Sequence, residues 1–356
     1  MTRQIIPIFI PFLGCPHDCA FCNQVKITNY KDMADENSII KQIEDYLTYF
    51  KDKKTAKEIA FYGGSFTGLP YETMVSYLKI AGIYKKKGII DRIRLSTRPD
   101  YINNFILDTL KAYEVDTIEL GIQSFDDEVL AANERGHSAL DSKRASKLIK
   151  DYGFKLGHQI MPGLYKDKME KIIKTALESA KIKPDIARIY PTLVIKDTKL
   201  EKFYKDGLYQ PLSLEEAVEI SAEILMIFAY KDINVIRIGL QPTENINEGR
   251  DVVAGPFHAA MRQLVESYIY RLYLEEVIKK ENVSGDALIH AKAKDISLIA
   301  GNKKSNKKYF YDKARIKIAF VGDEDFYLES DNRKITLDLK GFIKAYVKKK
   351  YGGDLN

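Results

Sequence analysis

Residues 5–22 read IIPIFIPFLGCPHDCAFC, and this stretch decides how the rest of the chain is interpreted. The run 5–12 is rich in β-branched and aromatic residues, which predicts a strand. All three cysteines of the 356-residue chain follow within the eight positions 15–22. We therefore expect the cysteines on the loop that leaves the carboxyl end of the first strand, where α/β proteins commonly place functional residues.

Strand-like and helix-like segments alternate beyond this stretch. Such alternation predicts an α/β fold with parallel strands and helical crossovers, either a barrel or an open sheet. The expected strands after the first are 58–64, 91–97, 116–124, 155–163, 185–194 and 234–240. The expected helices are 38–50, 71–86, 103–112, 139–151, 168–180 and 214–230.

Composition is typical of a globular protein, with 45% hydrophobic and 30% charged residues. The length suggests about two domains. No apolar run is long enough for a membrane span and the first residues lack a secretory pattern, so we expect a cytoplasmic protein. The net charge of +6 is uneven, because residues 291–356 alone carry +7.

Polar or glycine-rich clusters follow each of the next five expected strands. Since the carboxyl ends of parallel strands meet at one edge of a sheet, we expect these clusters to converge with the cysteines. The clusters are GGSF (63–66), STRPD (96–100), GIQS (121–124), HQIMPG (158–163) and YPT (190–192).

Three neighbouring thiols are compatible with more than one site. A closed zinc site needs four ligands, and His17 could be the fourth, although it is crowded between Cys15 and Cys19. Iron–sulfur clusters usually take four cysteines, so three would leave one iron open to a substrate or cofactor. Three incidental thiols are the remaining alternative.

The cysteine spacing, with Phe21 before the last cysteine and Gly-Gly ending the second strand, resembles the radical S-adenosylmethionine superfamily. FYGGSFTGLP (61–70), ELGIQSFDDEVL (119–130) and above all IYPTLVIKDTKLEKFYKDGLYQP (189–211) resemble the radical domain of the Elongator catalytic subunit, which modifies wobble uridine in tRNA. The resemblance spans about residues 5–265. It implies a partial (βα)6 TIM-like barrel.

The resemblance also implies roles for individual residues. Cys15, Cys19 and Cys22 would ligate a 4Fe-4S cluster whose open iron binds S-adenosylmethionine. The residues expected to contact that cofactor are Phe21, Gly63, Gly64, Ser65, Gln123, Arg135 and Gln159. Glycine lets backbone carbonyls approach an ammonium group, and a guanidinium suits a carboxylate. An ordinary turn at 63–64 and a surface position for Arg135 are the simpler alternatives.

Three features depart from the Elongator pattern. That family has a longer gap between its first two cysteines. It has glutamate where this chain has Ser96, and a hydroxyl cannot give the charged hydrogen bond of a carboxylate. Nothing after residue 265 resembles its acetyltransferase domain.

We expect a radical domain over 1–255, a connecting helix within 256–282 and a basic α+β domain over 283–356. The order of elements in the last part resembles the KH RNA-binding module, in which a G-x-x-G loop contacts the nucleotide backbone. Gly301 occupies the first glycine position, and Lys304 replaces the second. The candidate RNA-binding residues are Lys303, Lys304, Lys307 and Lys308, with a solvated basic surface as the alternative.

The sequence thus predicts a radical enzyme that reductively cleaves S-adenosylmethionine to a 5'-deoxyadenosyl radical and abstracts hydrogen from tRNA or another RNA. An external flavodoxin- or ferredoxin-like protein would supply the electron. Two alternatives remain: a radical enzyme acting on a small metabolite or tetrapyrrole, and a binding protein that has a cluster and no turnover.

Overall fold

The computed structural model describes residues 4–10, 19–23, 35–50, 52, 55–241 and 250–355. Contacts divide the chain into two units, Met1–Leu212 with Ile233–Phe257, and Ser213–Asp232 with His258–Asn356. Cys15 and His17 lie outside the described residues. Among the described helices, none combines the length and the apolar character needed to cross a membrane.

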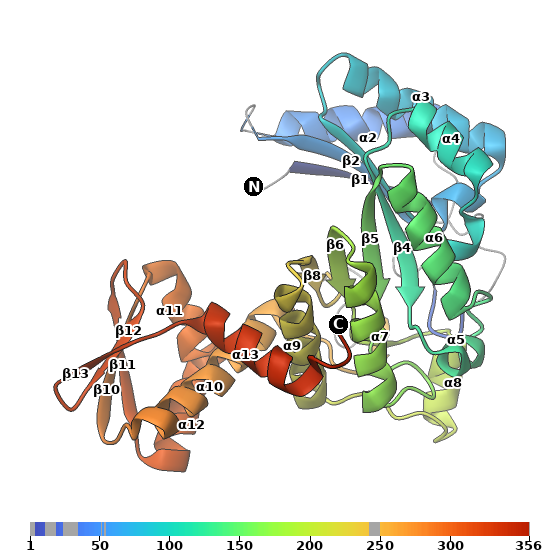
Figure 1. Cartoon of the computed structure of the whole chain (residues 1–356). Helices are drawn as coiled ribbons and strands as arrows, with labels where there is room; N and C mark the ends of the chain where they lie inside the picture. The colour runs from blue at the N-terminus through green and yellow to red at the C-terminus, as the bar shows by residue number, and fades with distance from the viewer. Residues whose placement is uncertain are drawn as a thin grey trace. The chain divides into compact units, whose positions relative to one another are not determined.

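A parallel seven-stranded sheet forms the first unit and curls into a half-barrel (Figure 1). The spatial order β1-β2-β3-β4-β5-β6-β8 follows the sequence, so all carboxyl ends meet at one rim, as expected. The strands are β1 (Gln4–Ile10), β2 (Lys57–Gly63), β3 (Arg92–Thr97), β4 (Thr117–Gln123), β5 (Lys155–Ile160), β6 (Ile186–Ile189) and β8 (Asn234–Ile238).

Side-chain caps start most of the helices that alternate with these strands. Asp35 and Asn103 accept from backbone N–H groups three residues onward, and Ser138 forms a reciprocal capping box with Asp141. The helices are α2 (Glu36–Tyr49), α3 (Tyr71–Lys86), α4 (Asn104–Ala112), α5 (Asp127–Ala132), α6 (Ala139–Asp151), α7 (Met169–Ile182) and α8 (Lys199–Lys205). Two short 3-10 helices, η2 (Phe66–Gly68) and η3 (Pro99–Tyr101), follow β2 and β3.

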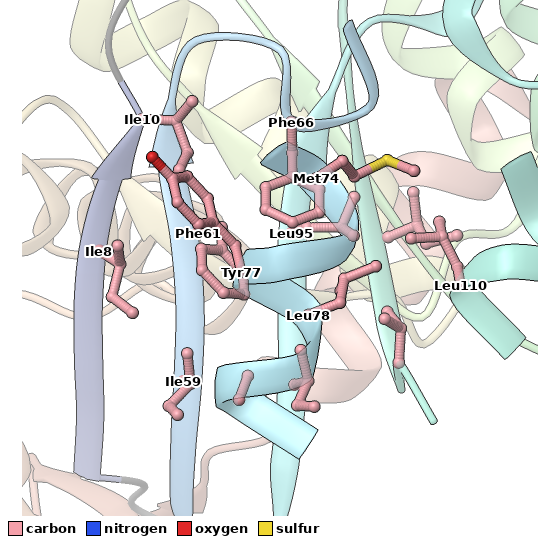
Figure 2. Packing of buried hydrophobic residues seen from close by; sticks show 14 of the residues in the cluster. Ile8, Ile10, Ile59, Phe61, Phe66, Met74, Tyr77, Leu78, Leu95 and Leu110 are labelled. Atoms are coloured by element: carbon pink, nitrogen blue, oxygen red, sulfur yellow. The ribbon is translucent and has the colours of Figure 1, made fainter. Parts of the chain in front are cut away.

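The hydrophobic core lies between the helices and one face of the sheet. Alternate residues of each strand point to this face, including Ile59 and Phe61 of β2, and pack against Tyr77 and Leu78 of α3 (Figure 2). The Phe61 ring lies 4.6 Å from that of Phe66, centroid to centroid. The opposite, concave face is therefore left for polar residues.

The expected strand 185–194 is only partly correct. Strand β6 ends at Ile189, and Val194–Ile195 (β7) pairs antiparallel with Val252–Ala254 (β9) in a separate small sheet. Pro191 cannot donate a ladder hydrogen bond, and both the N–H and the hydroxyl of Thr192 donate to the Pro162 carbonyl at 3.0 Å. These contacts turn the chain away from the main sheet.

The second unit combines a mixed sheet with helices. The sheet order is β11-β10-β12-β13, with β10 and β11 parallel and the other pairs antiparallel. Its strands are β10 (Asp286–Ala291), β11 (Lys317–Gly322), β12 (Tyr327–Ser330) and β13 (Arg333–Thr336). Its helices are α9 (Leu214–Tyr230), α10 (Met261–Glu281), α11 (Ala293–Ala300), the 3-10 helix η4 (Asn302–Lys304), α12 (Ser305–Ala314) and α13 (Leu339–Tyr351).

Helix α9 belongs by its contacts to this second unit, although it lies in sequence between β6 and β8. Glu223 of α9 accepts hydrogen bonds from three residues of α13, namely Tyr346, Lys350 and Tyr351. Strand β10 was not expected from the sequence. The helix–basic loop–helix order that follows it was expected and is present.

We predict that Leu78→Ala lowers the free energy of unfolding by about 2 to 5 kcal/mol, because Leu78 is fully buried between α3 and the sheet. The matched control is Leu140→Ala in α6, where the side chain is 52% exposed and little change is expected. Denaturant midpoints measure both. Similar midpoints for the two variants would contradict the packing described above.

Candidate functional site

The described part of the cysteine loop, residues 19–23, is held at the rim by backbone hydrogen bonds. The Ala20 N–H donates to the Asn133 carbonyl, and the Leu200 N–H donates to the Ala20 carbonyl. Cys19 and Phe21 are buried in a hydrophobic cluster with Val129, Leu164, Val194, Leu200 and Tyr209. The loop is therefore fixed by packing as well as by hydrogen bonds, and Phe21 anchors it.

Arg135 links the cysteine loop to strand β4. Its Nη1 lies 3.3 Å from the Cys19 sulfur, and its Nη2 donates to the Gly121 carbonyl at 2.7 Å. The side chain is only 7% exposed, so the alternative of a surface arginine does not hold. Its Nε is buried and has no hydrogen-bond partner among the described residues. A buried cationic donor without an acceptor is unusual and marks a place for an anionic group.

Gly121 makes this position of Arg135 sterically feasible. A Cβ at residue 121 would lie 2.8 Å from Arg135 Nη2 and 3.0 Å from Gln123 Nε2. Gln123 has a positive φ of 67°, where the register of β4 shifts. Its side-chain oxygen accepts from Gln159 Nε2 at 3.5 Å. The structure thus brings together the two predicted glutamines and Arg135 around one glycine.

The segment Gly63–Ser65 turns at the end of the neighbouring strand β2. Gly63 has a φ of 97°, a conformation that favours glycine, and the Gly64 N–H donates to the Ile10 carbonyl. The Ser65 hydroxyl is buried and accepts from the Arg98 N–H at 3.0 Å. Ser65 therefore ties the end of β3 to this turn.

His137 lies buried two residues after Arg135. Burial lowers the pKa of His137 to about 3, so the ring is neutral at physiological pH. Its Nε2 lies 3.3 Å from the Ile122 carbonyl, and its Nδ1 has no partner among the described residues. The arginine therefore provides the positive charge next to the cysteine loop.

A buried ionic network occupies the concave face below the rim. The Glu119 carboxylate of β4 lies 2.7 Å from Nη1 of Arg94 (β3) and 2.5 Å from Nε of Arg188 (β6). Arg94 also forms an ion pair with Glu58 of β2. The two arginines keep the pKa of the Glu119 carboxyl low despite the opposing effect of its burial. Ser96 lies two residues after Arg94, on the same face of β3.

Sequence reasoning missed this network and Gly121. The available signal was a charged residue in the middle of each of three expected strands, at Arg94, Glu119 and Arg188. Strands of a parallel sheet are usually apolar on both faces, so these charges indicate that one face is not covered by helices.

The predicted RNA-binding lysines lie on two adjoining elements of the second unit, Lys303 and Lys304 on η4 and Lys307 and Lys308 in the first turn of α12. Lys303, Lys304 and Lys308 are exposed, and Lys307 Nζ lies 5.8 Å from the centroid of the Phe320 ring. Gly301 has a φ of 80°, and a Cβ there would lie 2.8 Å from the Asn306 nitrogen. Gly301 is therefore required for the close turn that leads into α12.

Comparison with family models identifies the class of protein. The model of the Radical SAM superfamily matches residues 9–177, and that of the Radical_SAM C-terminal domain matches residues 184–271. The chain belongs to the radical SAM superfamily, a superfamily of enzymes that use S-adenosylmethionine (SAM), and the curled half-barrel is its typical fold.

Within this superfamily the chain is similar to proteins of the Elongator type. It is 38% identical over 129 residues to the tRNA uridine(34) acetyltransferase of Methanocaldococcus jannaschii, a match covering 35% of this chain and 24% of that protein. It is 26% identical over 232 residues to the enzyme of the same name from Dehalococcoides mccartyi, covering 56% of this chain and 50% of that protein. The chain thus spans a quarter to a half of the length of these relatives.

A solved structure supports the fold. The archaeal Methanocaldococcus infernus Elp3 with an N-terminal deletion aligns with a TM-score of 0.59 and 22% identity, over 79% of this chain and 64% of that one. An uncharacterized protein of M. jannaschii is 29% identical over 230 residues, covering 62% of this chain and 70% of that protein.

The residues at the rim fit the cofactors that the superfamily implies. Cys19 and Cys22 supply two sulfurs within one hydrogen-bonded turn, and the unpaired Arg135 Nε suits a carboxylate such as that of methionine. No group of three His, Cys, Asp or Glu side chains that could hold a metal is found within the described residues. The third candidate ligand, Cys15, is outside them.

We predict that Gly121→Ala weakens SAM binding about tenfold or more while leaving the iron content unchanged, because the new methyl group displaces the Arg135 guanidinium. Equilibrium dialysis with labelled SAM measures the affinity. The control is Gly82→Ala in α3, where a Cβ meets nothing within 4 Å. Unchanged SAM affinity in Gly121→Ala would show that Arg135 does not contact the cofactor.

Proposed function

We propose that this protein is a radical SAM enzyme that modifies RNA, with tRNA as the first candidate. A 4Fe-4S cluster with bound SAM would supply a 5'-deoxyadenosyl radical, formed by reductive cleavage, that abstracts a hydrogen atom from the substrate. Cys15, Cys19 and Cys22 would hold the cluster. The electron would come from an external flavodoxin- or ferredoxin-like protein, and a cytoplasmic location belongs to the same proposal.

The arrangement of Arg135 carries the proposal for the cofactor. One guanidinium contacts a cysteine of the predicted ligand set and the carbonyl of Gly121 within β4, and its Nε has no partner among the described residues. A carboxylate bound there would lie next to the cysteine loop. Gln123 and Gln159 would contact the same cofactor from β4 and β5, and the turn at Gly63 and Gly64 would contact it from β2.

Two observations support RNA as the substrate class. The relatives described above are named for acetylation of uridine 34 in tRNA. The second unit also presents exposed lysines between α11 and α12 and in the first turn of α12, where phosphate groups could be neutralised. The identity of the added group does not follow from these residues.

The cluster is tested by anaerobic reconstitution. We expect about four irons and four sulfides per chain, and loss of 5'-deoxyadenosine formation in each of Cys15→Ala, Cys19→Ala and Cys22→Ala, because two thiolates cannot hold an open cluster. Wild-type chain incubated with SAM and a reductant is the reference. Stoichiometric zinc without visible absorbance would establish the closed zinc site instead, and a bound cluster without SAM cleavage would establish a binding protein.

The RNA-binding loop is tested by two quadruple variants of the full chain that remove equal charge. We expect the change of Lys303, Lys304, Lys307 and Lys308 to Ala to weaken tRNA binding at least tenfold, because these lysines lie together on η4 and the first turn of α12. The control set consists of four exposed lysines of α13, namely Lys340, Lys344, Lys348 and Lys349. Lys350 is left intact because it hydrogen-bonds Glu223.

Filter binding at several salt concentrations measures both variants. Equal losses of tRNA affinity in the two variants would mean that Lys303, Lys304, Lys307 and Lys308 act only through non-specific charge. Absence of tRNA binding by the wild-type chain at low salt would remove RNA from the proposed function and favour a small-molecule substrate.

A further inference from the structure

Arg188 holds two tyrosines on the concave face of the half-barrel. Its Nε and Nη2 donate to the two carboxylate oxygens of Glu119, which fixes the plane of the guanidinium. Nη1 donates to the Tyr190 hydroxyl and Nη2 to the Tyr62 hydroxyl, each at 3.2 Å. The hydroxyl oxygens of Tyr62, on β2, and of Tyr190, just after β6, are thus hydrogen-bonded to one fixed guanidinium group.

Both tyrosines act as acceptors in these contacts, so their own O–H groups remain available as donors. No other hydrogen bond of either hydroxyl is found among the described residues. A phenol has one proton to donate, and the guanidinium has none to accept. Within the part of the chain that the structure describes, each O–H is therefore available to donate to water or to a ligand.

Both tyrosines and Arg188 retain some exposure to solvent. Tyr62 and Tyr190 are half-buried, and the Arg188 side chain retains 13% of its exposure. Tyr62 immediately precedes Gly63 and Gly64, and Tyr190 follows β6 at the same rim. Tyr62 thus lies on the strand that leads to the proposed SAM contacts at Gly63 and Gly64. Tyr190 follows the strand that pairs with β5, which carries Gln159, so both tyrosines lie near the rim that a substrate must approach.

The donors around this position favour an uncharged acceptor. Glu58, Arg94, Glu119 and Arg188 form a network whose formal charges sum to zero, so it offers no net attraction to an anion. Two neutral O–H donors match a carbonyl oxygen, which accepts two hydrogen bonds. Burial also raises the pKa of Tyr62, so this phenol keeps its proton.

We propose that Tyr62 and Tyr190, oriented by Arg188, form a two-donor clamp that binds a carbonyl oxygen of the substrate base and so positions the base for hydrogen abstraction. This inference rests on the proposed RNA substrate. Uridine, which has two base carbonyls, is the corresponding probe. The clamp is distinct from the SAM contacts, because none of its residues belongs to the set predicted for that cofactor.

The test uses Tyr62→Phe, Tyr190→Phe and the double variant, each of which removes only hydroxyl groups. Tyr71→Phe is the matched control, because Tyr71 is exposed on α3 and its ring packs on Phe105. Uridine binding to the reconstituted protein with SAM is measured by saturation-transfer NMR. Inorganic phosphate is added as a competitor, because it would displace uridine from a site that binds anions.

We expect each single variant to raise the dissociation constant for uridine about 3- to 10-fold and the double variant to lose detectable binding. Tyr71→Phe should match the wild type, and phosphate should not displace uridine. SAM affinity and thermal unfolding of the clamp variants serve as readouts of the fold. If the two tyrosines had only a structural role, their variants would change the SAM affinity and the thermal unfolding, and would leave the preference for uridine over phosphate unaltered.

Wild-type uridine affinity in the double variant, no uridine binding by the wild type, or displacement by phosphate would each overturn the clamp. Failure of the proposed function is recognised separately, because it appears as absence of 5'-deoxyadenosine formation or of its stimulation by tRNA in the wild type. The uridine titration requires neither turnover nor tRNA.

Discussion

The carboxylate of Glu119 on β4 accepts hydrogen bonds from Arg94 on the adjacent strand β3 and from Arg188 on β6, two strands away on the other side. This carboxylate is almost completely removed from water. A buried carboxylate costs several kcal/mol unless its oxygens are paired, and loss of one partner leaves an uncompensated charge. The concave face is organised around this constraint. Gly157 on β5 provides the space, because a Cβ there would lie 2.7 Å from Glu119 Cγ. Two residues further along β4, Gly121 in turn accepts from Arg135.

Much of the fold could be predicted because each local pattern agreed with the tertiary arrangement. Five of the six strands after the first lie within a few residues of the expected bounds, and so do the long helices that alternate with them. The exception is β6, which was expected to end at 194 and ends at Ile189. The errors occurred where elements are short. Helices α5 and α8 have six and seven residues, and β10 carries alanine and histidine in a strand of six residues. Such segments contain too few positions for a period to be recognised.

The candidate site was predictable to a different extent. The cysteine count and the clusters after the strands indicated the rim, because parallel strands bring their carboxyl ends together. The direction of Arg135 depends on the turn that precedes α6, where Glu134 and Gly136 both have positive φ, and no periodic pattern encodes it. To predict that Arg94, Glu119 and Arg188 point to the concave face, one must know which face of the sheet the helices cover. The role of Gly121, which lies within β4, could be interpreted only once the structure showed that the Arg135 side chain packs against it.

The chain passes from the first unit to the second near residue 212, returns near 233 and leaves again near 257. The second unit is therefore no detachable module. A protein shortened to its first 257 residues would retain α9 without α10 and α13, the two helices of the second unit that contact it. Because only residues 231–233 join α9 to β8, any force on the second unit would be transmitted along the backbone to β8, the last strand of the half-barrel.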